Sequence, residues 1–293
     1  MRTEKEMLDL ILNIAKENEL IRAVYMNGSR TNPNVPKDIF QDYDIVYVVS
    51  ETKPFYEDES WIDCFGSRLY MQMPEKMDYL RGDNHNFDET YGWLIQFEDG
   101  NRLDLHVESI PFSLKKILLD KLCVALLDKD DILPQIQEST DEDYHVKKPL
   151  ENEFICDCNN FWWCLNNVAK GLWREEVPYV MDMINYHIRP NLINLLSWKI
   201  GIDTNYTCSV GKSGKYMCNF LEEDMYNRFL STYSDGKVDN IWNATLSMCD
   251  LFDEVAVEVS NKLGYKYNKE EADASRSFLE HVRSLPRDAK EVY

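Results

Sequence analysis

The hydrophobic pattern of the chain changes near its middle, and this change limits the folds it can adopt. Up to about residue 140, short β-prone runs alternate with short helical stretches, whereas from residue 151 onward long segments carry apolar side chains at helical spacing. The 293 residues suffice for two ordinary hydrophobic cores. We therefore expect an α+β fold, in which residues 1–140 form a mixed β-sheet with flanking helices and residues 141–293 form an all-helical bundle.

The N-terminal half carries the signals of a sheet. Residues 43–49 are strongly β-prone and should form a central strand, and Asp99-Gly100 between two β-prone runs indicates a hairpin. Strands are also expected at residues 21–26, 68–73, 93–97, 103–107 and 123–127, helices at residues 4–17 and 113–121, and the end of a short helix at residues 61–65.

The C-terminal half reads as helix almost throughout. The segments that favour helix over strand are residues 151–173, 175–200, 222–233 and 238–263. Pro190 lies inside the second segment, where it should kink or break the helix because proline has no backbone N–H to donate. The polar stretch of residues 138–148 is the expected boundary between the halves.

The charge balance excludes one large class of partner. The chain has 52 acidic and 32 basic residues, a net charge of −20, whereas a nucleic-acid-binding surface needs clustered Lys and Arg. The excess either keeps the surface solvated or attracts a polycation. No stretch reaches the roughly 20 apolar residues of a membrane span, and the cysteines show no zinc spacing. We expect reduced thiols in a cytoplasmic protein without a membrane partner.

Two aspartates open the expected central strand. Side chains at positions i and i+2 of a strand point to the same face, so Asp42 and Asp44 should project together and repel each other unless a cation separates them. Hard oxygen ligands suit Mg²⁺. Asp104, on a later strand, would add a third carboxylate to that face. Three carboxylates can hold two metal ions around an in-line phosphoryl displacement.

The run Gly28-Ser29-Arg30 follows the first expected strand. Glycine lets a phosphate approach the backbone, serine offers a hydroxyl donor, and Arg30 is a candidate to pair with a phosphate oxygen. Each signal alone is common, since Asp-x-Asp arises by chance in acidic chains, Gly-Ser is usually a turn, and Asp104 can be an ordinary polar strand position. The order of the three signals along the chain is far more specific.

These motifs carry a resemblance to a known family. Gly28-Ser29-Arg30-Thr31 followed by Gln41-Asp42-Tyr43-Asp44-Ile45 resembles the signature of the polymerase-β-like nucleotidyltransferase superfamily. More narrowly, the chain is similar to the aminoglycoside 6-adenylyltransferases, the streptomycin-modifying kind. The similarity extends through residues 97–105, 126–130, 153–154, 161–162, 168–172, 188–192, 211–212 and 215–217.

The resemblance implies an enzyme that transfers AMP from Mg-ATP to a hydroxyl of an aminoglycoside, such as the 6-position of streptomycin, releasing pyrophosphate and conferring antibiotic resistance. It implies that Asp42 and Asp44 hold ATP with two Mg²⁺ ions. It also implies that Asp104 completes the metal site and is a candidate to accept the hydroxyl proton. His106 stands where the family is expected to have a small residue. His106 either lines the site or is a neutral strand residue, and we favour the second interpretation.

The helical half would complete the nucleotide and acceptor sites. By resemblance, Lys170 is a candidate for the ATP phosphates, although it can also be a surface lysine. Lys212 and Lys215 lie in a glycine-containing stretch that lacks the P-loop spacing, and either can make a supporting phosphate contact. Aromatic and acidic side chains suit a cationic acceptor. The candidates are Trp173, Glu175, Glu176 and Asp182. In the alternative interpretation, Trp173 belongs to the hydrophobic core and the three acids are solvated helix positions.

Two alternatives stay open at this stage. One keeps the fold and the reaction but changes the acceptor to another small molecule or a protein. The other is a catalytically silent nucleotide-binding module, against which the intact Asp42, Asp44 and Asp104 argue, because a silent relative has no need of three mutually repelling carboxylates. The sequence is compatible with a monomer or a homodimer.

Overall fold

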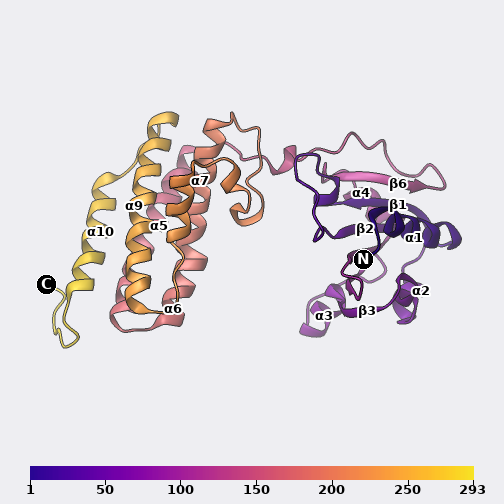
Figure 1. Cartoon of the computed structure of the whole chain (residues 1–293), viewed down its shortest axis with the longest axis horizontal. Helices are drawn as coiled ribbons and strands as arrows, with labels where there is room; N and C mark the ends of the chain where they lie inside the picture. The colour runs from indigo at the N-terminus through magenta and orange to yellow at the C-terminus, as the bar shows by residue number, and fades with distance from the viewer. The chain divides into compact units, whose positions relative to one another are not determined.

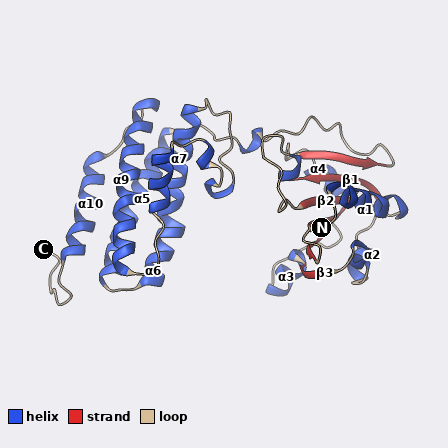
Figure 2. Ribbon diagram, viewed as in Figure 1, coloured by secondary structure: helices blue, strands red, loops and turns tan.

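The computed structural model describes all 293 residues, which divide into two compact units, Met1–Asp143 and Tyr144–Tyr293. The division falls within the polar stretch of residues 138–148. All strands belong to the first unit, and the second is helical, as Figure 2 shows by colour. The α+β fold class expected from the sequence is therefore confirmed.

The first unit is built on one six-stranded mixed sheet with the order β3-β4-β5-β2-β1-β6. Strands β2 and β5 pair in parallel, and every other neighbouring pair is antiparallel. The 43–49 strand is central, and the 123–127 strand lies at an edge, as expected. The strands are β1 (Ile21–Asn27), β2 (Tyr43–Val49), β3 (Arg68–Gln72), β4 (Thr90–Phe97), β5 (Arg102–Ser109) and β6 (Cys123–Asp128).

Apolar side chains cover both faces of this sheet. Met7 and Ile11 of the first helix pack with Ile45 and other residues of one face, and the hydroxyl of Tyr47 donates to the backbone oxygen of Ile11 at 2.6 Å. The opposite face carries a smaller apolar cluster that includes Val46. The helices of the unit are α1 (Glu4–Glu17), α2 (Lys53–Glu57), α3 (Pro74–Arg81) and α4 (Ile110–Lys116), with 3-10 turns at η1 (Ser29–Thr31) and η2 (Trp61–Phe65) and a further one, η3 (Glu142–Tyr144), at the boundary.

One predicted helix was misplaced. The sequence suggested a helix over residues 113–121, but α4 runs from Ile110 to Lys116 and follows β5 directly. Pro111 lies in its first turn, where the missing N–H would have no intrahelical partner, so the proline does not delay the start of the helix. The short helices α2 and α3, which the sequence pattern did not indicate, also begin with a proline in the first turn.

The second unit is a helical bundle in which α5, α7, α9 and α10 run alongside one another (Figure 1). Its core includes a stacked pair, Phe161 of α5 and Phe252 of α9, with ring centroids 3.7 Å apart. No helix of the chain combines the length and apolar character needed to cross a membrane. The elements are α5 (Glu151–Trp173), α6 (Val177–Asp182), η4 (Met183–Ile188), α7 (Arg189–Asp203), η5 (Lys212–Gly214), η6 (Met217–Asn219), α8 (Glu223–Ser231), α9 (Val238–Leu263) and α10 (Lys269–Ser284).

The break expected near Pro190 is present and has a defined form. The segment predicted as one helix over residues 175–200 is divided into α6, the π-helical turn η4 and α7. Pro190 falls in the first turn of α7, immediately after the π-helical turn. A proline cannot donate to the preceding turn, and a π-type turn is a common way for a helix to absorb such an interruption.

Candidate active site

Three carboxylates from separate points of the chain meet at one end of β2 and β5. Asp42 precedes β2, Asp44 lies within it, and Asp104 lies in β5. The parallel pairing of these strands sets Asp44 directly beside Asp104. One oxygen from each of the three carboxylates lies within 4.8 Å of the others. The convergence expected from the sequence is therefore present in the fold.

The cluster carries negative charge that the fold does not fully compensate. Burial, followed by the neighbouring charges of Asp42 and Asp104, raises the pKa of Asp44 to about 7. Each of these causes penalises the ionised carboxylate, and a bound cation would relieve all of them. Oxygen donors at this spacing are the ligand set that a hard divalent cation such as Mg²⁺ prefers.

The cation nearest to the cluster within the chain is Arg102, at the start of β5. Its Nε and Nη2 atoms donate to the two carboxylate oxygens of Asp104 at 2.8 and 2.7 Å. Its Nε also lies 3.5 Å from Oδ2 of Asp42. Arg102 was not among the residues predicted from the sequence, although its position two residues before Asp104 on one strand indicates that both side chains share a face.

Gly28 makes room for the cluster. A Cβ at this position would lie 2.1 Å from Oδ2 of Asp44, and the backbone φ of 77° is one that L side chains rarely adopt. The N–H of Gly28 donates to the backbone oxygen of Leu122 at 3.2 Å. The role that the structure shows for Gly28 is thus close approach to a carboxylate. Ser29 follows at the start of η1, and its contact with a phosphate stays a prediction.

The structure does not support the predicted phosphate contact of Arg30. Its guanidinium donates to the backbone oxygens of Gln41 and Asp42 at 2.6 and 3.2 Å and lies 3.8 Å from the ring centre of Tyr43. The side chain is only 7% exposed. Arg30 therefore holds the segment that leads into β2, and so positions Asp42, instead of presenting charge to a ligand.

Asp44 and Asp104 line a cavity of about 440 Å³ on this face of the sheet. Further along the cavity lies the carboxylate of Glu108, which is 1% exposed. Glu108 accepts hydrogen bonds from the hydroxyl of Tyr25 at 3.0 Å and from Nζ of Lys116 at 2.8 Å. Burial and the adjacent Glu108 carboxylate raise the pKa of Tyr25 well above its ordinary value. These hydrogen bonds hold the carboxylate of Glu108 in one position in the lining of the cavity.

His106 lies in strand β5 and lines the same cavity, which favours the alternative that it lines the site. Its Nε2 lies 3.5 Å from Oε1 of Glu75 at the start of α3. Glu75 in turn accepts from the backbone N–H of Gly92 at 3.0 Å. Burial opposes ionisation of Glu75, but hydrogen bonds from its neighbours, led by His106, bring its pKa below the ordinary value. Glu75 was not among the predicted site residues, because α3 itself was not predicted.

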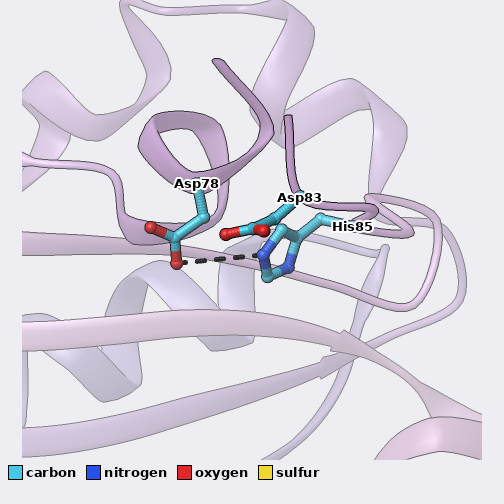
Figure 3. Close-up of side chains that lie close together, drawn as sticks. All are labelled: Asp78, Asp83 and His85. Atoms are coloured by element: carbon cyan, nitrogen blue, oxygen red, sulfur yellow. Dashed lines mark ion pairs between the residues drawn. The ribbon is translucent and has the colours of Figure 1, made fainter. Parts of the chain in front are cut away.

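A second group of possible metal ligands lies at the end of α3, where Asp78, Asp83 and His85 point toward one another (Figure 3). The Nε2 of His85 is 3.8 Å from Oδ2 of Asp78, and Arg81 already supplies a cation 3.6 Å from Oδ1 of Asp78. Gly82, in the left-handed conformation, turns the chain back so that these side chains meet. We assign no role to this surface group.

A family model described as streptomycin adenylyltransferase matches residues 1–282. This chain belongs to that family. It is a nucleotidyltransferase enzyme, as the sequence analysis predicted.

Individual relatives of this streptomycin adenylyltransferase family member agree in name. An aminoglycoside 6-adenylyltransferase of Campylobacter jejuni is 37% identical, with 91% of each chain covered. One from Bacillus subtilis (strain 168) is 38% identical, covering 91% of this chain and 93% of the relative. The crystal structure of an aminoglycoside 6-adenyltransferase from Bacillus subtilis aligns with a TM-score of 0.48 at 32% identity, over 97% of this chain and 100% of that one.

In the helical unit of this family member, Lys170 and Trp173 share one cavity of about 290 Å³, which residues of the C-terminal segment also line. Lys170 is exposed near the end of α5. The indole N–H of Trp173 is buried and has no hydrogen-bond partner within the chain. An unpaired buried donor is costly, so this N–H is open to a ligand or water.

The remaining predicted residues of this unit are exposed, and several contact other charges or rings. Glu175, which has a φ of 60°, forms an ion pair with Arg287. Oε2 of Glu176 lies 3.8 Å from Nη1 of Arg174. The other three are Asp182 at the end of α6, Lys212 in η5, and Lys215, whose Nζ is 4.9 Å from the ring centre of Tyr216. Roles of these residues in binding the nucleotide or the acceptor stay predictions.

Proposed function

We propose that this enzyme transfers AMP from Mg-ATP to a hydroxyl of an aminoglycoside antibiotic, namely the 6-hydroxyl of streptomycin, and releases pyrophosphate. The family match and the relatives named aminoglycoside 6-adenylyltransferase support the acceptor class. Because ATP is an intracellular co-substrate, we propose that the enzyme works in the cytoplasm, where modification of the drug would confer resistance.

The observation that carries this proposal is the group of three carboxylates within 4.8 Å, Asp42, Asp44 and Asp104. Its donors are all hard oxygens, and the raised pKa of Asp44 marks charge that a divalent cation would neutralise. In this proposal these three residues hold two Mg²⁺ ions. Bound Mg²⁺ would neutralise the triphosphate and make the acceptor hydroxyl easier to deprotonate.

The chain's own residues position the reactants. In the proposed reaction, the acceptor oxygen forms a bond to the α-phosphorus, and the bond from that phosphorus to the bridging oxygen of the β-phosphate breaks. Asp104 is the proposed acceptor of the hydroxyl proton, since it lies near the start of β5 beside Asp44. Positioning and charge neutralisation supply most of the expected rate enhancement.

The acidic lining of the cavity suits a cationic acceptor. Asp120 lines it together with Asp44 and Asp104, whereas the buried carboxylate of Glu108 is already paired with Lys116. Carboxylates pair favourably with guanidinium and ammonium groups, which aminoglycosides carry. In the helical unit, the proposed acceptor contacts are Trp173, Glu175, Glu176 and Asp182. The proposed nucleotide contacts of that unit are Lys170, Lys212 and Lys215. In the first unit, Ser29 is the proposed nucleotide contact.

The test is AMP transfer from ATP labelled at the α-phosphate to a panel of acceptors that includes streptomycin, other aminoglycosides and a protein extract. We expect a labelled streptomycin adduct that requires Mg²⁺ and carries AMP on the 6-oxygen by NMR. The Asp104→Asn variant is the negative control. Labelling of a different acceptor, with none of streptomycin, would refute the acceptor, and the absence of any Mg²⁺-dependent ATP binding would refute the reaction.

A further inference from the structure

Arg102 occupies the position where a metal ion is expected to bind. Its Nε and Nη2 atoms donate to the two carboxylate oxygens of Asp104 at 2.8 and 2.7 Å, and its Nε lies 3.5 Å from Oδ2 of Asp42. The cation thus contacts two of the three carboxylates proposed to hold Mg²⁺. No hydrogen bond to a group outside this cluster holds the guanidinium in place.

A guanidinium and a divalent cation cannot share these oxygens without repelling each other. The charge of an arginine is permanent at physiological pH, so it cannot be removed by losing a proton. Metal binding to Asp104 must therefore either weaken or break the contact with Arg102. In the chain alone, the same contact relieves part of the repulsion among the three carboxylates.

Arg102 is much more exposed than Arg30, and the fold leaves space around its guanidinium. Its side chain is 46% exposed, and it is the first residue of β5, just after the β4–β5 turn. Arg30 is 7% exposed and bound to two backbone oxygens. A released guanidinium beside this site would find its best partner in a phosphate, whose oxygens match its planar set of donors.

We propose that Arg102 is a built-in counter-cation that competes with Mg²⁺ for Asp104 and Asp42, and that it moves its guanidinium to the triphosphate when metal and nucleotide bind together. Metal alone then binds weakly, and the nucleotide strengthens its binding. This inference rests on the proposed function, because it assigns the carboxylates to a metal and the phosphates to ATP.

The test measures two affinities of Arg102→Gln that should change in opposite directions. Mn²⁺ is titrated into the full-length protein at pH 8 without nucleotide and followed by electron paramagnetic resonance. A non-hydrolysable ATP analogue is titrated separately at saturating Mg²⁺. We expect the variant to bind Mn²⁺ alone about tenfold more tightly and the analogue about tenfold more weakly, which is an ordinary size for coupling between sites. Arg102→Lys, which keeps the charge, should stay nearer the wild type in the Mn²⁺ titration.

The matched control is Arg68→Gln, which removes an arginine of the same unit that pairs with Asp63 outside the cluster. Both of its affinities should equal those of the wild type, and circular dichroism should show that all variants are folded. Unchanged or weaker Mn²⁺ binding in Arg102→Gln would overturn the inference and leave the proposed function intact. If the wild type bound neither Mn²⁺ nor the analogue, the proposed function would fail as well.

Discussion

Asp44 and Asp104 stand side by side on the parallel strands β2 and β5, although sixty residues separate them along the chain. Burial is the largest cause that raises the pKa of Asp44 to about 7, and the neighbouring charges of Asp42 and Asp104 come next. A fold that holds these carboxylates together without a metal ion gives up stability for the ability to bind one.

The Asp44→Asn variant should be more stable than the wild type when metal is removed. The amide carries no charge, so it ends the repulsion with Asp42 and Asp104 and the cost of burying a charge. At pH 8, where an Asp44 carboxyl with a pKa of about 7 is mostly ionised, we expect the melting temperature in EDTA to rise by a few degrees, a gain of about 1–2 kcal/mol in the free energy of unfolding. Mg²⁺ should raise the melting temperature of the wild type only, and AMP transfer should fall by about 10³-fold or more in the variant. A lower melting temperature in EDTA would contradict this account.

The Gly28→Ala variant should lose stability and the arrangement of the carboxylates together. The new Cβ would lie 2.1 Å from Oδ2 of Asp44, and the φ of 77° adds backbone strain. Gly82→Ala is the matched control, because Gly82 also has a positive φ of 102° but no atom within 4 Å of its added Cβ. Urea denaturation should show a loss of about 1 kcal/mol in the control and about 2–4 kcal/mol at Gly28. Equal losses would show that the clash does not matter.

The contribution of Asp99 to stability should depend on pH. Burial alone would raise the pKa of Asp99, but hydrogen bonds from Arg2, at 2.7 Å and 2.9 Å, and from Asn101 hold it below the ordinary value. A lowered pKa in the folded state means that the unfolded chain binds the proton more readily, so this stabilisation is present above about pH 4 and is lost as pH falls further.

The check is the difference in free energy of unfolding between the wild type and Asp99→Asn, measured from pH 7 to pH 3. Other acids titrate over the same range in both proteins, so the difference isolates Asp99. We expect about 1–3 kcal/mol at pH 7 and a shrinking difference below about pH 4. A difference that grew toward low pH would have the wrong sign.

In the helical unit, Arg189 should contribute far more than an exposed arginine. It is 6% exposed, donates to the hydroxyl and the backbone oxygen of Thr232 at 2.8 and 3.1 Å, and lies 3.7 Å from the ring centre of Tyr233. Removing it by Arg189→Ala leaves the buried groups of Thr232 without their donor, which should cost about 2–4 kcal/mol in chemical denaturation. Arg228→Ala, which breaks an exposed ion pair with Glu254, should cost less than about 1 kcal/mol. Similar losses in the two variants would contradict the assignment.

Local patterns in the sequence were sufficient for much of the fold. The helices Glu151–Trp173 and Val238–Leu263 have the bounds expected from their periodicity, because a long helix repeats its apolar positions many times. Weak local signals failed. The helix predicted at residue 113 begins at Ile110, and α3, which supplies Glu75, is too short to show a period. The two interpretations of His106 stayed open in the sequence, since a strand position does not reveal what packs against its face.

The sequence by itself indicated that Asp42 and Asp44 project together, and where the chain changes from sheet to bundle. The tertiary structure alone decided that β2 pairs with β5 in the register that joins Asp44 to Asp104, that Arg30 turns inward, and that Arg102 sits on the carboxylates. The physical reason is the separation along the chain over which each kind of interaction acts. Backbone geometry relates residues a few positions apart, whereas strand order and the choice of a charge's partner depend on contacts between distant segments.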